Sequence, residues 1–204
     1  MSNNENIINS VAGDLFYGDI NESSVFPFPK FSTDQSEMAS EMVNAVARFA
    51  EEQIDSEKLD TNQAIPDEIT QGLAMLGLCG LAVPESYGGM ELDYSLYSRV
   101  FSEVAGFDGS IATMLGAHQS IGYRALLNEG TEEQKQKWLP KLASGEMLAS
   151  FCLTEPSSGS DAYSIKTKAV KNEDGNYILN GQKLWITNAG TAGFYTVFCK
   201  TDHE

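Results

Sequence analysis

A run of hydroxyl and carboxylate side chains around one glycine is the part of this sequence best equipped for chemistry. It occupies Cys152–Ser164 and reads CLTEPSSGSDAYS. Glycine lets the backbone turn and present N–H groups, and hydroxyl donors stand beside it. Such a loop can hold an electron-rich heterocycle or a pyrophosphate, although serine- and glycine-rich runs are also ordinary surface turns. On this run alone, both interpretations stay open.

A second run, Asn180–Asn188, reads NGQKLWITN and adds an aromatic ring and a hydroxyl. Taken alone, Trp185 is typical of a core residue on an amphipathic strand, and Thr187 of a β-branched strand residue. In the first run, Glu155 and Asp161 are candidates for a general base. Loop carboxylates more commonly bind backbone N–H groups, so we predict that Glu155 has a structural role, in the loop or paired with a lysine.

The elements that position these runs begin with a helical half. Apolar residues recur every three or four positions from Thr33, which predicts a helix there. Proline, capping and periodicity signals predict further helices over 66–77, around 96–104, over 110–128 and from Thr131 to the residue before Pro140. His118 lies on the helix predicted over 110–128 and is more typical of a buried core histidine than of a catalytic one.

Beyond Gly145 the pattern is typical of strands. Strands are predicted over 147–153, 177–179, 183–187 and 194–199. Asn180-Gly181 is a strong hairpin signal, and Asp174-Gly175 marks another turn. The order of elements predicts an α+β fold, with an all-α helical bundle followed by a partial antiparallel β domain. We place an N-terminal extension at 1–30, the helical domain at 31–146 and the β domain at 147–204.

The composition disfavours several functions. The net charge of −16, from 29 acidic and 13 basic residues, would repel nucleic acid. Three widely spaced cysteines fit a reducing compartment better than a disulfide framework, and two histidines are too few for a histidine-based metal site. No apolar run approaches the roughly 18 residues of a membrane span. The N-terminus lacks the features of a secretory or mitochondrial leader, so we expect a cytoplasmic location.

Three motifs in these runs resemble the flavin-binding signature of the acyl-CoA dehydrogenase family. They are Thr154-Glu155-Pro156, Gly159-Ser160-Asp161 and Trp185-Ile186-Thr187-Asn188, in the family's order and approximate spacing. The similarity runs from about Phe26 to Glu204, and the run GAHQSIG at 116–122 is most similar to the very-long-chain branch. The resemblance implies an α domain followed by a β domain. It also implies that the chain stops inside the middle domain and lacks the C-terminal helical domain.

The same resemblance implies that FAD is the cofactor. The cofactor contacts that it implies are Phe151, Cys152, Leu153, Thr154, Gly159, Ser160, Trp185, Ile186 and Thr187. Ser160 would also contact substrate, and the small residues Ala112 and Gly116 would form the floor of the acyl pocket; close helix packing explains small residues equally well. The family's base is a carboxylate of the C-terminal domain, so no catalytic residue and no metal ligand is assigned in this chain.

The function that the resemblance implies is FAD-dependent α,β-dehydrogenation of long-chain fatty acyl-CoA to trans-2-enoyl-CoA, in fatty acid β-oxidation. Electrons would pass to an electron-transferring flavoprotein, and the full-length protein would be a homo-oligomer. We expect this chain alone to be inactive. Two alternatives stay open: a flavin monooxygenase or oxidase on the same fold, and a non-catalytic assembly factor.

Overall fold

The computed structural model describes residues 11–27 and 30–201, and the chain divides into two compact units, Met1–Glu37 and Met38–Glu204. The first unit holds helix α1 (Val11–Phe16), the short 3-10 helix η1 (Glu22–Ser24) and the start of α2 (Thr33–Gln53). Of the predicted extension at 1–30, residues 1–10 and 28–29 lie outside the described residues. Helix α2 begins at Thr33, as its periodicity predicts.

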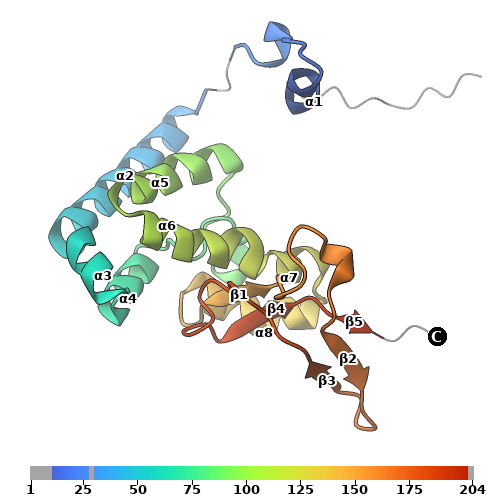
Figure 1. Ribbon diagram of the computed structural model, residues 1–204. Helices are drawn as coiled ribbons and strands as arrows, with labels where there is room; N and C mark the ends of the chain where they lie inside the picture. The colour runs from blue at the N-terminus through green and yellow to red at the C-terminus, as the bar shows by residue number, and fades with distance from the viewer. Residues whose placement is uncertain (1–10, 28–29, 202–204) are drawn as a thin grey trace, which may run out of the picture. The chain divides into compact units, whose positions relative to one another are not determined.

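The second unit begins with a helical part, which Figure 1 shows around α5 and α6. Its further helices are α3 (Ser56–Asn62), α4 (Asp67–Met75), α5 (Tyr94–Phe107), α6 (Gly109–Gly116), α7 (Arg124–Glu129) and α8 (Glu132–Ala143), with 3-10 turns η2 (Glu85–Tyr87) and η4 (Ala162–Ser164). Helix α5 has the predicted apolar face, with Leu96, Val100 and Val104 buried. Helix α8 begins at the predicted capping box, where the Thr131 hydroxyl accepts from the backbone N–H of Gln134. Apolar faces of the helices meet in a shared core that includes Leu73.

Two helix predictions are wrong in their extent. The single helix expected over 110–128 is divided, because a π-helical segment, η3 (Ala117–Gly122), separates α6 from α7. Helix α8 passes through Pro140 and ends at Ala143. Proline removes one backbone donor from a helix, but here the last turn buries Leu142 and Ala143 in a second apolar cluster, which outweighs that loss.

The strands form two small sheets. They are β1 (Ala149–Cys152), β2 (Lys168–Lys171), β3 (Tyr177–Asn180), β4 (Phe194–Val197) and β5 (Lys200–Thr201). Strand β1 pairs with β4, and the other sheet has the order β3-β2-β5. The α+β class is confirmed, but the expected antiparallel pairing holds only for β2 with β3. Both β1–β4 and β2–β5 are parallel. Parallel partners need long connections, and a long stretch of chain does separate the strands of each pair.

The hairpin lies at a different turn from the one that the sequence signal favours. Strands β2 and β3 are joined at Asp174-Gly175, where Gly175 has a φ of 83°. Residues 183–187 do not form a strand. Gly181 instead lies against Thr167, and a Cβ added to it would collide with the backbone and the Oγ1 atom of Thr167. A close approach of two backbones, and not a hairpin, therefore requires glycine at this position.

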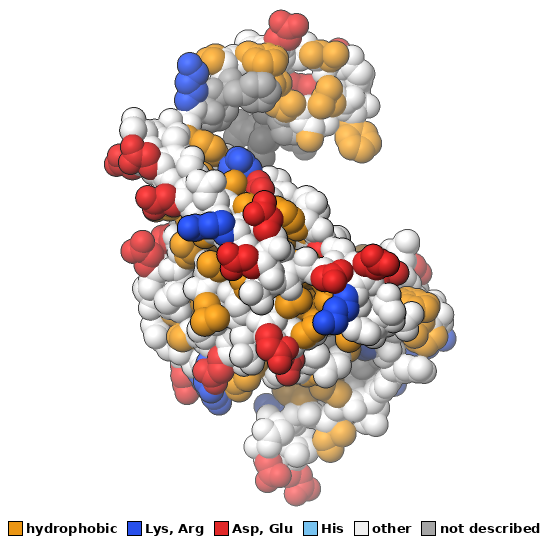
Figure 2. All heavy atoms as spheres, turned by 90° about the vertical axis from the view of Figure 1, so that its left-hand side faces the viewer, with side chains coloured by type: hydrophobic (Ala, Val, Ile, Leu, Met, Phe, Trp, Pro, Cys, Tyr) orange, Lys and Arg blue, Asp and Glu red, His pale blue; other side chains and the backbone are white. Residues whose placement is uncertain are grey.

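The negative charge is spread over the surface. On the face shown in Figure 2, acidic side chains are scattered over the helical part, with a few lysine and arginine side chains between them. Within the described part of the chain, none of the helices combines the length and the hydropathy of a membrane span. The three cysteines are unpaired.

Candidate functional site

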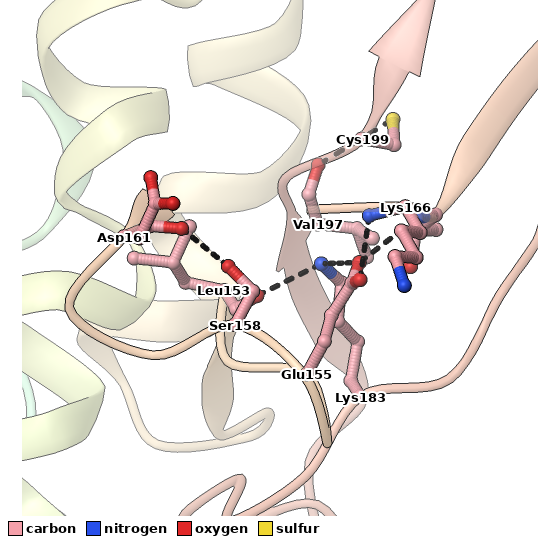
Figure 3. A network of polar contacts seen from close by, with 9 residues as sticks. Leu153, Glu155, Ser158, Asp161, Lys166, Lys183, Val197 and Cys199 are labelled. Atoms are coloured by element: carbon pink, nitrogen blue, oxygen red, sulfur yellow. Dashed lines mark hydrogen bonds and ion pairs between the residues drawn. The ribbon is translucent and has the colours of Figure 1, made fainter. Parts of the chain in front are cut away.

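The two sequence runs meet at a buried ion pair, shown in Figure 3. The Lys183 Nζ atom lies 2.9 Å from the Glu155 Oε1 atom, and it also donates to the Leu153 carbonyl at 2.9 Å. The same carboxylate accepts from the backbone N–H groups of Lys166 at 2.6 Å and Thr167 at 2.9 Å. Glu155 is therefore the point where three separate segments of the β domain are joined.

This environment keeps the Glu155 carboxyl group charged. The Thr167 hydroxyl, the backbone N–H groups of Lys166 and Thr167 and the Lys183 ammonium group lower the pKa of Glu155 to about 2, against the opposing effect of burial. The Thr167 Oγ1 atom is buried and makes no hydrogen bond of standard geometry within the described part of the chain. A carboxylate so occupied is a structural clamp, as predicted, and not a base waiting for substrate.

The loop after Glu155 is closed by its own hydrogen bonds. The backbone N–H of Glu155 donates to the Ser158 carbonyl at 2.8 Å, and the reverse bond measures 3.1 Å. The Ser158 hydroxyl then donates to the Asp161 carbonyl. Gly159 and Ser160 lie exposed at the tip, and no atom comes within 4 Å of a Cβ added to Gly159. These two predicted contact residues are thus presented to solvent.

The second run presents an exposed indole beside the first. The backbone N–H of Leu184 donates to the Thr154 carbonyl at 2.9 Å, which brings Thr154 next to Trp185. Trp185 is 83% exposed and has a φ of 58°. A bulky residue rarely adopts this left-handed conformation, and such residues cluster at functional sites. The interpretation of Trp185 as a core residue is therefore wrong.

The remaining predicted cofactor contacts differ in accessibility. Ile186 is half-buried and Thr187 is exposed, with the Thr187 carbonyl accepting from the Ser150 hydroxyl at 2.9 Å. Phe151 is half-buried, with its ring centroid 5.0 Å from that of Phe198. Leu153 is also half-buried. Cys152 faces inward, and burial raises the pKa of its thiol, so it contributes only backbone groups to this surface.

The predicted substrate residues on α6, Ala112 and Gly116, pack against other residues of the helical part. A Cβ added to Gly116 would lie 3.4 Å from the Phe101 ring, and Ala112 packs against the helical core. A cleft of about 960 Å³ opens beside the site, and from α6 it is lined by Ser110, Thr113 and Met114 and not by Ala112 or Gly116. Thr187 and Asn188 line the same cleft. Ala112 and Gly116 therefore stay predictions for the acyl pocket.

The π-helical segment η3 supplies two buried polar side chains, and one of them, His118, joins the helical and β parts. The backbone N–H of Ala149 donates to the His118 Nδ1 atom at 2.9 Å, so the ring proton lies on Nε2, which donates to the Leu142 carbonyl at 3.0 Å. Burial lowers the pKa of His118 to about 4, and the ring is neutral. Gln119 donates to the Leu78 carbonyl and accepts from a backbone N–H. His118 is thus a core histidine, as predicted.

The residues that hold the site in place, Asn188 and Ser150, carry little or no signal in the sequence. Asn188 stands at the end of the second motif, and its side chain bonds to two backbone carbonyls. Ser150 lies on β1 and is completely buried. The only signal for Asn188 was its place in the motif, and Ser150 had no signal of its own.

Comparisons with known proteins match most of the described β part and most of the helices. Residues 36–146 match the family "Acyl-CoA dehydrogenase, N-terminal domain", and residues 150–204 match "Acyl-CoA dehydrogenase, middle domain". The very long-chain specific acyl-CoA dehydrogenase, mitochondrial, of Macaca fascicularis is 49% identical over 194 residues. That match covers 94% of this chain and 30% of the macaque protein.

Two solved structures show the same fold. An acyl-CoA dehydrogenase complexed with FAD from Bacillus anthracis has a TM-score of 0.78 and 36% identity, covering 90% of this chain and 31% of that chain. A prolyl acyl carrier protein oxidase has a TM-score of 0.75 and 31% identity, covering 83% of this chain and 45% of that chain. The chain therefore spans less than half the length of either solved protein.

Proposed function

This chain belongs to the acyl-CoA dehydrogenase family, and on that premise we propose that it holds FAD in a polypeptide that oxidises long-chain fatty acyl-CoA to trans-2-enoyl-CoA. The observation that carries the proposal is Trp185, an 83% exposed indole in a left-handed backbone conformation beside Thr154. The similarity to the macaque enzyme supports the long-chain substrate. We propose residues 31–146 and 147–204 as the N-terminal and middle domains.

The residues around Trp185 fit a flavin. A flat, largely apolar ring system with polar edges needs an aromatic face and hydrogen-bond donors at fixed positions. Trp185 offers the face, and the hydroxyls of Thr154 and Thr187 with nearby backbone N–H groups offer the donors. The exposed tip at Gly159 and Ser160 offers unobstructed backbone and a further hydroxyl. The FAD-bound Bacillus anthracis protein of the same fold supports this assignment.

In the proposed reaction, the residues of this chain bind the cofactor and orient it. FAD, when bound, supplies the acceptor for a hydride from the β carbon of the acyl group. Donors from Thr187 and the backbone at 153–154 would hold the polar edge of the ring and would favour negative charge there. Glu155 does not take the α proton, because its oxygens already accept from Lys183 and two backbone N–H groups. The proton acceptor is a carboxylate from outside this chain, as the family resemblance implies.

The test uses the complete polypeptide that carries this chain. Anaerobic addition of palmitoyl-CoA to the FAD-loaded protein should bleach the flavin absorbance. Trp185→Ala should weaken FAD binding by about tenfold or more, since it removes an aromatic contact face. Tyr94→Ala, which removes another exposed aromatic side chain from α5, should leave binding unchanged. FAD binding without bleaching would rule out the dehydrogenase, and no FAD binding would rule out the site itself.

A second candidate function is oxidation with molecular oxygen as the acceptor. It is favoured by the shared fold of the prolyl acyl carrier protein oxidase. Hydrogen peroxide released during turnover in air would support this candidate over the dehydrogenase. A stable protein partner without any turnover would instead favour the non-catalytic assembly factor.

The proposed function also raises the questions of the protein's partners and of its location in the cell. We propose an electron-transferring flavoprotein as the electron acceptor and a homo-oligomer as the complete form. Reduction of added electron-transferring flavoprotein and the mass in solution test these two points. The predicted cytoplasmic location differs from that of the macaque relative, which is mitochondrial by name. Fractionation of the source cells, with detection of the complete polypeptide, decides between the two compartments.

A further inference from the structure

We propose that Asn188 is a positioning residue, which fixes the backbone of Trp185-Ile186-Thr187 against the helical part; this inference rests on the proposed FAD site. The Trp185 side chain is exposed, so core packing does not hold it in place. Its orientation must come from the backbone on either side. The anchor before it is the bond from Leu184 to Thr154, and the anchors after it involve Thr187 and Asn188.

The Asn188 side chain uses both of its donor hydrogens. Its Nδ2 atom donates to the Met114 carbonyl at 3.0 Å and to the Ala149 carbonyl at 3.2 Å. One acceptor is on helix α6 and the other is on strand β1. Asn188 itself has a φ of 66°, a conformation that asparagine tolerates better than most residues other than glycine. One side chain thus ties the loop to a helix and a strand simultaneously.

The helix offers the Met114 carbonyl, which also accepts from the backbone N–H of Ala117, at the point where its hydrogen-bond pattern changes to the π-helical segment. Met114 lies in the last turn of α6, directly before η3. Around this segment, other carbonyls also accept from side chains: the Ser120 hydroxyl donates to Gly116 at 2.7 Å, and the Thr196 hydroxyl donates to Gly122 at 2.7 Å. A change from α to π geometry disrupts the regular ladder and is frequent at functional sites. Here it gives the β part places to attach.

Strand β1 provides the second support for the same loop. The buried Ser150 hydroxyl donates to the Thr187 carbonyl at 2.9 Å. Ala149, whose carbonyl accepts from Asn188, is itself held through its N–H by His118. The loop that carries Trp185 therefore rests on a strand that the buried histidine already fixes. This continuity makes Asn188 the link between the rigid core and the proposed cofactor face.

The chemistry of the amide group predicts distinct effects for two substitutions. Asn188→Asp keeps the shape, but an ionised carboxylate has no donor and faces two carbonyl oxygens. A protonated aspartate regains one donor. Asn188→Gly keeps the left-handed backbone and loses both hydrogen bonds at every pH.

The chain has two tryptophans, Trp138 and Trp185. The experiment therefore makes both Asn188 variants in a chain that also carries Trp138→Phe, so that all tryptophan fluorescence comes from Trp185. The readouts are the fluorescence anisotropy and acrylamide quenching of Trp185 without FAD. Both variants should lower the anisotropy, and only Asn188→Asp should recover part of it as the pH falls below the ordinary aspartate range. Asn180→Asp, at the exposed end of β3, is the matched control and should change neither readout. FAD binding to the complete polypeptide should weaken by about tenfold in both variants.

The outcomes separate this inference from the proposed function. Unchanged anisotropy in both Asn188 variants would overturn the positioning role, even if the melting temperature fell. Equal anisotropy losses in the two variants at all pH values would also overturn it, because donation by the side chain would then be irrelevant. If the parent polypeptide does not bind FAD, the proposed function fails, while the anisotropy still decides whether Asn188 orients Trp185.

Discussion

The two sheets of the β part differ sharply in how they are held. In β1, Ala149, Ser150 and Cys152 are buried, whereas all four residues of β3 are exposed. Strand β1 lies against the π-helical segment and binds His118 and Asn188. The β3-β2-β5 sheet depends mainly on its own ladder. Stability is therefore concentrated at β1, and the proposed cofactor loop is attached to that stable strand.

The largest expected effect comes from a cavity next to the π-helical segment. Leu115 at the end of α6 is fully buried, and Leu115→Ala should lower the free energy of unfolding by about 2 to 5 kcal/mol. Leu179→Ala on the exposed strand β3 should lower it by less than about 0.5 kcal/mol. Urea unfolding of both variants measures the contrast. Equal losses would show that the core beside β1 and the β3-β2-β5 sheet contribute alike to stability.

The second effect is a pH dependence that arises from His118. The ring is neutral when folded, with a pKa lowered to about 4 from 6.5, so the unfolded chain binds a proton first as the pH falls. The stabilisation by neutral His118 is full above pH 6.5 and is lost as the pH falls toward 4, by about 3 kcal/mol in total. Urea unfolding across this range should show the loss. In His118→Gln, which has no such titration, the slope over this range should be smaller; an unchanged slope would contradict the prediction.

The third effect concerns the Glu155 clamp at lower pH. Its folded pKa of about 2 lies below the ordinary 4.5, so its contribution to stability is present above 4.5 and is lost as the pH falls to 2. Glu155→Gln should be less stable than the parent at neutral pH, and the difference should shrink in acid. Thermal unfolding at neutral and acidic pH measures this convergence. A constant difference would mean that the charge of Glu155 is not what joins the segments.

The smallest expected effect on stability comes from Gly159. A Cβ at this position would meet no atom within 4 Å, and the backbone is not left-handed, so Gly159→Ala should change stability by less than about 0.5 kcal/mol. FAD affinity of the complete polypeptide should nevertheless fall, because the loop tip is a proposed contact. Gly175→Ala, at a hairpin turn with a φ of 83°, is the reverse control: it should lower stability without changing affinity.

Local signals in the sequence predicted the helices well where the residues that carry the signal are also the ones that cap or bury the helix. The capping box at Thr131 begins α8, and the period of apolar residues marks α2 and α5. Glu155 and His118 both have the structural roles that their contexts indicated. These features depend on residues within a few positions of one another, so a single sequence is sufficient to indicate them.

Features that depend on distant partners could not be predicted in this way. Asn180-Gly181 has the composition of a hairpin, but its glycine is required by the approach of Thr167. Pro140 predicts a helix end, yet burial of Leu142 continues α8 beyond it. The π-helical segment and the bonds of Asn188 depend on the β part packing beside α6, and no local pattern encodes that contact.

The exposed sheet has a consequence for the protein in concentrated solution. Strand β3 is at the edge of its sheet, and its Tyr177, Ile178 and Leu179 side chains are each more than half exposed. An edge with free backbone groups and apolar side chains is a template for strand addition by another chain. We therefore expect this chain to aggregate through β3 as its concentration rises, and a charged residue at position 178 should suppress that association.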